Sequence, residues 1–185
     1  IKFFGKVCVI GRGAAIAAAY ERAKKLKEAG NAITAIISAR TADLLIYKEE
    51  FKEISDRFYT VTDDGSEGVK GHANDVLKNL LDSGERFDLV YTVGAATLMR
   101  TVSEVTKPYN IKTIVSLNSL MVDGTGMCGC CRVTVGGKPM FTCVDGPEFD
   151  AHLVDFEGFR ARIHAYDQEE KMALELLEGN CKCKD

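Results

Sequence analysis

The sequence lacks several features that would assign it to a class at once. No apolar run among its 185 residues reaches the length needed to cross a membrane, so we expect no contact with a bilayer. It has no basic block and no interleaving of basic and aromatic residues, and its net charge is −3, so nucleic acid is not an expected partner. Its start shows no secretory signal, and we therefore expect a cytoplasmic protein with reduced thiols.

Seven cysteines stand out against this background, because three of them form a pattern with one aspartate. Intervals of four, two and eleven residues separate Asp123, Cys128, Cys131 and Cys143. This is the spacing of a plant-type [2Fe–2S] site, with aspartate in place of the first cysteine. Glycines between these residues allow the tight turns that such a loop needs. The pattern predicts an iron–sulfur cluster and therefore electron transfer.

A zinc site is the main alternative reading of the same cysteines. Cys128 and Cys131 form a C-x-x-C half-site, which Cys143 with Cys181 or Cys183 could complete. A second C-x-x-C is missing from the sequence, and glycines crowd the first loop, so the spacing favours the cluster. In the zinc alternative the chain is a structural α/β binding module without redox activity.

A disulfide framework is the other alternative, and the sequence does not favour it. The chain is not a very small domain that needs covalent cross-links, and the adjacent Cys130 and Cys131 suit paired disulfides poorly. Cys130 is left out of the proposed ligand set. Cys8 lies in an apolar run and is expected to be a buried, inert thiol.

The first two thirds of the chain alternate between apolar runs and helical patterns. Expected strands cover 7–10, 33–38, 58–61, 89–93 and 111–117, and expected helices cover 16–29, 43–55, 71–81 and 96–106. Continuous apolar strands separated by helices predict an α/β fold with a five-stranded parallel, doubly wound sheet covered on both faces. Ligands bind such sheets at the carboxyl ends of the strands.

The remaining chain has a different character, and it divides the sequence into three expected parts. A glycine-rich segment leads to a hairpin over 132–143, which turns at Gly136 and Gly137 and carries Cys143 back to the cysteine loop. Residues 149–159 are expected to be a connection and 166–177 a terminal helix. We expect an NAD(P)-binding domain over 1–118, a cluster-binding loop and hairpin over 119–150, and a C-terminal extension over 151–185.

Loops at the expected carboxyl ends of the strands could hold a nucleotide. The candidates for contacting it are Gly11, Gly13, Arg40, Asp64, Gly65, Ser66 and Gly94. Backbone amides in a glycine turn that opens a helix can bind phosphate, although the full G-x-G-x-x-G pattern is missing because Ile16 holds its third position. Each feature also has an ordinary structural reading, as a tight turn, an Asx turn or a solvated arginine. No side chain has the spacing of a catalytic acid, base or nucleophile, and His152 and His164 are expected to be structural.

Several segments together carry a resemblance to a known family. They are Gly11-Arg-Gly13, Ala39-Arg-Thr41, 62–71, the Gly94 loop, 115–118, 121–133 and 141–149. The chain resembles the ferredoxin–NADP reductase superfamily up to about residue 156. Within it, the sequence is similar to the electron-transfer subunit of dihydroorotate dehydrogenase and to the small subunit of NADH-dependent reduced ferredoxin:NADP oxidoreductase, the sulfide dehydrogenase type.

The resemblance implies a cofactor set and a partner. It implies a [2Fe–2S] cluster on Asp123, Cys128, Cys131 and Cys143, NAD(H) or NADP(H), and FAD in the full-length protein, with a larger iron–sulfur flavoprotein subunit and ferredoxin as partners. Hydride would pass between nicotinamide and FAD, and single electrons between FAD and the cluster. The FAD-binding barrel that precedes the nucleotide domain in relatives is not in this sequence, so the chain alone is expected to be inactive. Ala14 and Ala15 stand where relatives have more room for a pyrophosphate.

Overall fold

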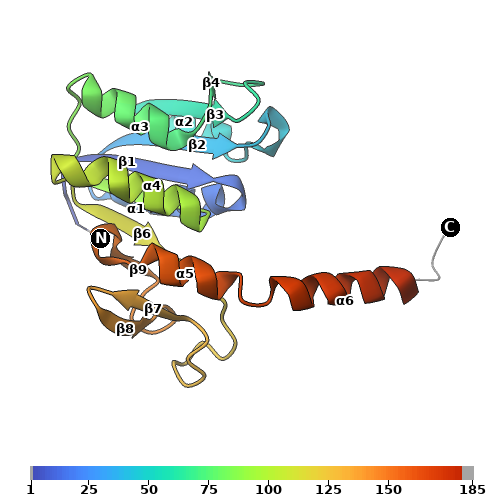
Figure 1. Ribbon diagram of the computed structural model, residues 1–185. Coiled ribbons are helices and arrows are strands. Elements are labelled where there is room, and N and C mark those ends of the chain that lie inside the picture. The colour runs from blue at the N-terminus through green and yellow to red at the C-terminus, as the bar shows by residue number, and fades with distance from the viewer. Residues whose placement is uncertain (1, 181–185) are drawn as a thin grey trace.

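A computed structural model describes residues 2–180, and Figure 1 shows a central sheet with helices on both faces. The sheet has seven strands in the order β4-β3-β2-β1-β5-β6-β9. Their bounds are β1 Lys6–Arg12, β2 Ala32–Ala39, β3 Arg57–Thr62, β4 Val69–Lys70, β5 Leu89–Val93, β6 Thr113–Ser116 and β9 Glu148–Asp150. The five expected strands are present and parallel, and β1 lies between β2 and β5.

The expectation of a five-stranded sheet is wrong, because one short strand is added at each edge. Val61 and Thr62 of β3 pair with the two residues of β4, which is parallel to β3. At the other edge, β9 is antiparallel to β6, with Val115 opposite Phe149. These additions are too short to leave a sequence signal, and they depend on pairing with strands formed elsewhere in the chain.

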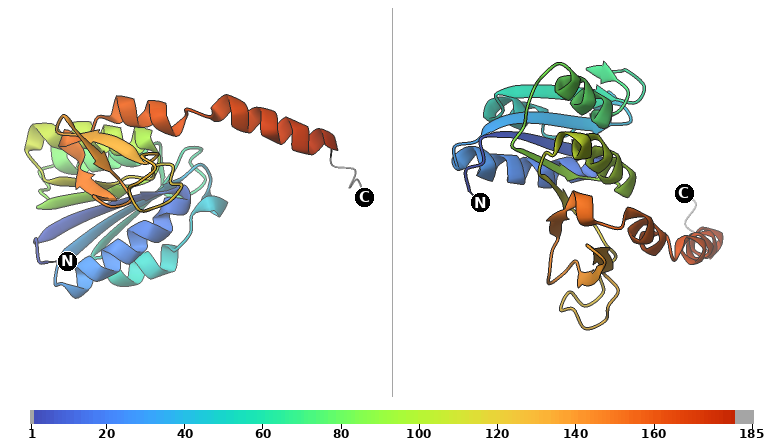
Figure 2. Two further views of the ribbon diagram at one scale, coloured as in Figure 1. Left: turned by 90° about the horizontal axis from the view of Figure 1, so that it is seen from below. Right: turned by 60° about the vertical axis from the view of Figure 1, so that its left-hand side comes forward.

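Helices cover the two faces of the sheet in pairs, as Figure 2 shows. Helices α1 (Ile16–Glu28) and α2 (Lys48–Ile54) lie on one face, and α3 (Ala73–Asp82) and α4 (Ala96–Thr106) on the other. Short 3₁₀ turns occupy Gly13–Ala15, Ala42–Leu44, Lys107–Tyr109 and Ala151–Leu153. The doubly wound α/β arrangement is therefore as expected.

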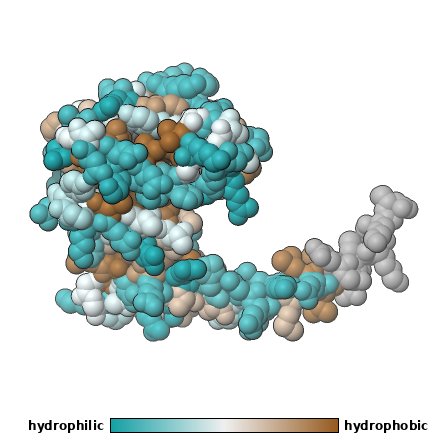
Figure 3. All heavy atoms as spheres, turned by 45° about the horizontal axis from the view of Figure 1, so that its top comes forward, coloured by the Kyte–Doolittle hydropathy of each residue, from teal (hydrophilic) through white to brown (hydrophobic). Residues whose placement is uncertain are grey.

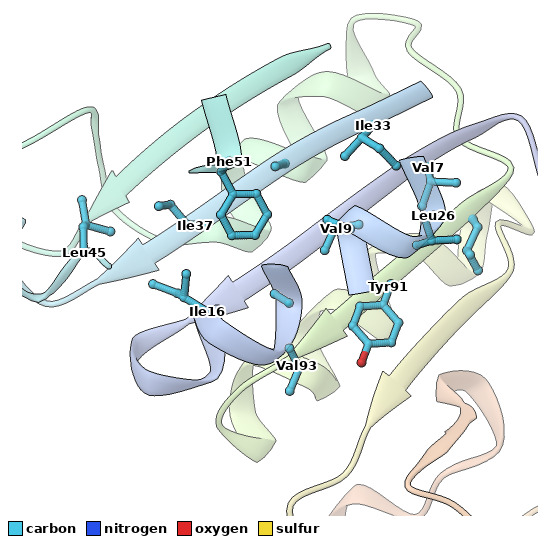
Figure 4. Close-up of a cluster of buried hydrophobic side chains, with 14 of the residues drawn as sticks. Val7, Val9, Ile16, Leu26, Ile33, Ile37, Leu45, Phe51, Tyr91 and Val93 are labelled. Atoms are coloured by element: carbon cyan, nitrogen blue, oxygen red, sulfur yellow. The ribbon is translucent and has the colours of Figure 1, made fainter. Parts of the chain in front are cut away.

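Each face of the sheet has its own hydrophobic core. Figure 4 shows the first core, in which Phe51 of α2 lies over the sheet. Its ring meets Tyr20 edge to face, with ring centroids 5.4 Å apart. Cys8 lies fully buried in the second core, as expected, and burial raises the pKa of its thiol. A thiol held neutral in this way is unreactive.

The helix expected over 43–55 is wrong in its first half. A 3₁₀ turn at Ala42–Leu44 is followed by extended backbone at Leu45, and α2 begins only at Lys48. Tyr47, directly before α2, has a left-handed backbone with φ of 59°. Its ring packs against Tyr20 at 5.1 Å between centroids. Tertiary packing therefore overrides the local helical pattern here.

The segment expected to be a connection, 149–159, holds regular structure instead. It contains most of β9, a 3₁₀ turn and the start of α5 (Phe156–Ile163). Asp155 caps α5, since its carboxylate accepts a hydrogen bond from the Gly158 amide at 3.0 Å. Phe156 and Phe159 form a third core with Val133 of the hairpin.

The hairpin and the terminal helix are present as expected. Strands β7 (Arg132–Val135) and β8 (Lys138–Phe141) pair in antiparallel fashion, and α6 spans Asp167–Asn180. Figures 1 and 3 show α6 projecting from the rest of the molecule, and Met172 and Leu176 on it are exposed. Among the described residues, no helix is long and apolar enough to span a membrane. Cys181 and Cys183 lie outside the described residues.

Candidate functional site

The cysteine loop, residues 117–131, connects β6 to β7 and lies on the molecular surface. Gly124, Gly126 and Gly129 all have positive φ, at 73°, 84° and 68°. Residues other than glycine adopt a positive φ only at a cost in free energy. These glycines therefore let the loop turn repeatedly between the proposed ligands. The exposed Val122 and Met127 lie in the same loop.

Asp123 organises the first part of the loop. Its carboxylate oxygens accept hydrogen bonds from the amides of Thr125, at 2.9 Å, and Cys128, at 2.8 Å. The amide of Thr125 contributes most to lowering the pKa of Asp123, and the amide of Cys128 lowers it further. Asp123 is thus an anionic oxygen donor held beside Cys128, one of the proposed thiolate ligands.

Cys131 and Cys143 meet at the end of the hairpin, as the sequence predicts. Their sulfur atoms are 3.3 Å apart, and this contact raises the pKa of the Cys143 thiol. Thr142 holds the backbone at this point, since its amide and its hydroxyl both donate to the Cys131 carbonyl, at 3.1 and 3.0 Å. Ser119 binds the Thr142 hydroxyl at 2.7 Å.

The four proposed ligands form two pairs in this structure. Within the described part of the chain, no three cysteine, histidine or acidic side chains converge on one point that could hold a metal ion. The described cysteines are all free thiols. The donor set nevertheless suits an iron–sulfur cluster, because it combines three thiols with an ionised carboxylate on a glycine-rich loop.

The candidate nucleotide site lies where β1 and β5 end side by side. The strand order reverses between them, which is the usual ligand position in doubly wound sheets. A Cβ on Gly94 would lie 3.3 Å from the Cβ of Arg12, so the loops after the two strands are in contact. Gly13 has φ of 59°, with no other atom within 4 Å of the place of a Cβ. The backbone at Gly13 is therefore open to a ligand.

Gly11 has a different setting from Gly13. A Cβ on Gly11 would lie 2.8 Å from the Cβ of Ala19 and 3.0 Å from the Cα of Ile16. Glycine is therefore needed here to let α1 approach β1 closely. The structural reading of this turn thus accounts for Gly11, whereas Gly13 remains free to meet a phosphate.

An ion pair that the sequence analysis missed crosses the carboxyl edge of the sheet. The Arg12 guanidinium donates two hydrogen bonds to Asp63, at 3.0 and 2.6 Å. Arg12 is the main cause of the lowered pKa of Asp63, and His72 and Arg40 contribute smaller charge effects. The two partners are 51 positions apart, so no local pattern could have revealed them.

Asp64, Gly65 and Ser66 form a turn after β3. Asp64 accepts hydrogen bonds from the Ser66 amide at 3.0 Å and from its hydroxyl at 2.7 Å, which makes an Asx turn. The Ser66 hydroxyl in turn accepts a bond from the Ala42 amide at 2.8 Å and ties two loops together. Arg40 is exposed beside them.

A cavity of about 240 Å³ opens between the end of β1 and the helices α3 and α4. It is lined by Arg12, His72, Ala73, Asn74, Thr97, Leu98 and Thr101. The first turns of α3 and α4 face it, and helix N-termini carry partial positive charge. The cavity therefore joins cationic and hydrogen-bonding side chains at the switch point of the sheet.

Comparison with known proteins finds a family match over the cysteine loop and hairpin, and relatives over nearly the whole chain. Residues 118–155 match the sequence profile of the iron-sulfur cluster binding domain of dihydroorotate dehydrogenase B. The chain is 46% identical over 175 residues to the dihydroorotate dehydrogenase B (NAD(+)) electron transfer subunit homolog of Thermotoga maritima, covering 95% of this chain and 61% of that protein. A probable electron transfer subunit from Methanocaldococcus jannaschii is 36% identical, with coverage of 78% and 54%.

A solved structure is also similar over nearly the whole chain. It is the NADH-dependent reduced ferredoxin-NADP oxidoreductase, studied for flavin-based electron bifurcation, with a TM-score of 0.86 and 44% identity. The match covers 95% of this chain and 63% of that one. The chain thus spans about three fifths of the length of two curated relatives that it matches, at 61% and 62%.

Proposed function

The chain is a homologue of the electron-transfer subunits of dihydroorotate dehydrogenase B, and on that premise we propose its function. It is the nucleotide-binding and cluster-bearing portion of an NAD(P)H-linked iron–sulfur flavoprotein oxidoreductase, which passes electrons to a partner subunit. The observation that carries this proposal is that an ionised Asp123 in the cysteine loop and the Cys131–Cys143 pair at the end of the hairpin both lie within the iron–sulfur profile match. We propose 1–118, 119–150 and 151–185 as the functional divisions of the chain.

Asp123, Cys128, Cys131 and Cys143 are the proposed ligands of a [2Fe–2S] cluster. When bound, the cluster supplies one-electron transfer, and FAD in the complete protein exchanges hydride with nicotinamide. The protein holds Asp123 ionised through two backbone amides and anchors the Cys131 carbonyl through Thr142. A carboxylate is a harder donor than a thiolate, so Asp123 also tunes the cluster. Zinc is the less favoured occupant, since the matching profile is an iron–sulfur domain.

The carboxyl edge of the sheet is the proposed binding site for NAD(H) or NADP(H). Gly13 offers open backbone, and Gly94 allows the close approach of the two switch-point loops. Arg12 and Arg40 supply positive charge. Asp64, Gly65 and Ser66 form a hydrogen-bonded turn after β3, at the side of the site. Gly11 contributes by letting α1 open directly at the strand end. A larger flavoprotein subunit and ferredoxin are the proposed partners.

Metal analysis of the anaerobically purified chain tests the cluster. We expect two irons and two acid-labile sulfides per chain and a visible spectrum that changes in Asp123→Ala. Asp123→Cys should keep the cluster, with a spectrum that differs from those of the wild type and of Asp123→Ala. Asp64→Ala is the matched control, because Asp64 makes a similar turn in another loop. Stoichiometric zinc without sulfide would overturn the proposal.

Two further measurements separate the nucleotide site from the cluster. Calorimetric titration with NADH and NADPH should show binding that Arg12→Ala weakens without loss of iron. The chain without an added flavoprotein is expected not to reduce a dye with NADH, because hydride transfer needs the flavin. Steady dye reduction by the chain alone would contradict this division of labour.

A further inference from the structure

One arginine outside the profile match reaches the cysteine loop from α5. Arg162 donates hydrogen bonds to the carbonyl oxygens of Gly129, at 3.3 Å, and Cys130, at 2.9 Å. These two residues lie between Cys128 and Cys131. The matched iron–sulfur segment ends at residue 155, so Arg162 lies beyond it. Figure 1 shows α5 lying over the β7–β8 hairpin, from where it can reach the loop.

A single peptide group links Arg162 to a proposed cluster ligand. The Gly129 carbonyl and the Cys130 N–H belong to the same planar unit. Its oxygen accepts from Arg162, and its N–H donates to the Cys128 sulfur at 3.4 Å. A hydrogen bond to the carbonyl oxygen polarises the peptide group. It thereby strengthens the hydrogen bond that the N–H of the same group donates to sulfur. Arg162 is thus connected to Cys128 without touching it.

The guanidinium of Arg162 is partly buried. Its Nε is buried and, among the described residues, has no hydrogen-bond partner. Arg162 also lines a cavity of about 510 Å³ beside the loop, together with Cys128, Cys130 and Tyr166. An arginine is always protonated, so a fixed positive charge lies next to the loop.

We propose that Arg162 is a positioning residue for the [2Fe–2S] cluster, which orients the Cys128–Cys131 segment and raises the reduction potential. The inference rests on the proposed function, because it requires the cluster. Reduction adds one electron and one negative charge to the cluster, with no proton transferred. A nearby cation and an N–H···S bond both stabilise the reduced form, and such bonds are known to set cluster potentials.

A potentiometric titration of the full chain with dithionite, followed by electron paramagnetic resonance, tests the proposal. Arg162→Met should shift the reduction equilibrium about tenfold toward the oxidised form, which is about 59 mV to the negative for one electron. Arg162→Lys keeps the charge but replaces the rigid, planar guanidinium with a flexible ammonium, so it should hold the potential near the wild-type value and release iron to a chelator faster. Arg160→Met is the matched control, since Arg160 is exposed on the same helix.

The outcomes separate this inference from the proposed function. An Arg162→Met protein with full iron and sulfide and an unshifted potential would overturn the inference alone, as would equal shifts in Arg162→Met and Arg160→Met. If Arg162→Met does not fold, Arg162→Lys decides, and wild-type iron release with a wild-type resonance signal would refute the positioning role. A wild-type chain without iron and sulfide would overturn both.

Discussion

Gly68→Ala is expected to be among the most damaging single-methyl additions at the candidate nucleotide site. Gly68 lies between β3 and β4 with φ of 66°. A Cβ there would stand 2.1 Å from the Thr60 carbonyl oxygen and 2.3 Å from the Thr60 hydroxyl. Gly84 is the matched control, because it has φ of 94° and no other atom within 4 Å of the place of a Cβ.

The difference between the two variants follows from their surroundings. A positive φ costs a residue with a side chain about 1 kcal/mol, and this cost applies to both variants. At Gly68 the loop must also move off Thr60, which strains the packing by about 1–3 kcal/mol. The movement breaks two hydrogen bonds between the Thr62 hydroxyl and Glu67, at 2.8 and 3.1 Å. Each contributes about 0.5–1.5 kcal/mol.

We therefore expect the free energy of unfolding to fall by about 5 kcal/mol in Gly68→Ala and by about 1 kcal/mol in Gly84→Ala. For a chain of this length, 1 kcal/mol lowers Tm by about 2–4 °C, so the first variant should melt about 10 °C lower or more. Urea and thermal unfolding followed by circular dichroism measure both. Equal losses in the two variants would show that the close approach to Thr60 does not constrain the loop.

Two further changes test the ion pair and the cysteine loop. The folded-state pKa of Asp63 lies below its ordinary value of 3.8, so its pairing with Arg12 stabilises the fold above that value and the gain is lost as pH falls below it. Urea unfolding should show Asp63→Asn less stable than wild type at pH 7, with the gap closing below about pH 4, and a constant gap would contradict this account. Thr142→Val should lower the free energy of unfolding by about 1–3 kcal/mol, because it removes one of the two donors to the Cys131 carbonyl and leaves the Ser119 hydroxyl without its partner. Chelator-driven iron release should also be faster in Thr142→Val, and Thr142→Ser, which keeps the hydroxyl, should release iron at the wild-type rate.

The regular α/β layers could be predicted from the sequence because their signals are local. The helix expected over 96–106 has the bounds of α4, and every expected parallel strand is present. Apolar strands, and helices that end at glycine or asparagine, can be predicted from a window of about ten residues. The hairpin with Gly136 and Gly137 at its turn is equally local.

The failures concern structure that depends on distant partners. Tyr47 adopts a left-handed backbone and packs on Tyr20, which the helical pattern of its neighbours conceals. Strand β9 has three residues and depends on the edge of β6. A better signal existed for α5, since Asp155 precedes it as an N-cap.

The candidate sites divide in the same way. The cysteine spacing and the hairpin pattern together pointed to the meeting of Cys131 and Cys143. Arg12 with Asp63, and Arg162 with the loop carbonyls, join residues tens of positions apart and leave no pattern in the sequence. The ligands within one loop can be predicted from its sequence. The side chains that support the loop from other elements can be identified only once the fold is known.

The central place of β1 in the sheet has a consequence for how the protein is made. Val7 pairs with Ile33 on one side but with Leu89 on the other. During synthesis, β1, β2 and β3 can come together early, yet one flank of β1 stays open until β5 leaves the ribosome. Exposed edges of this kind pair with other chains and are favoured targets of aggregation. One side of β1 therefore stays unpaired while the stretch between β3 and β5 is translated.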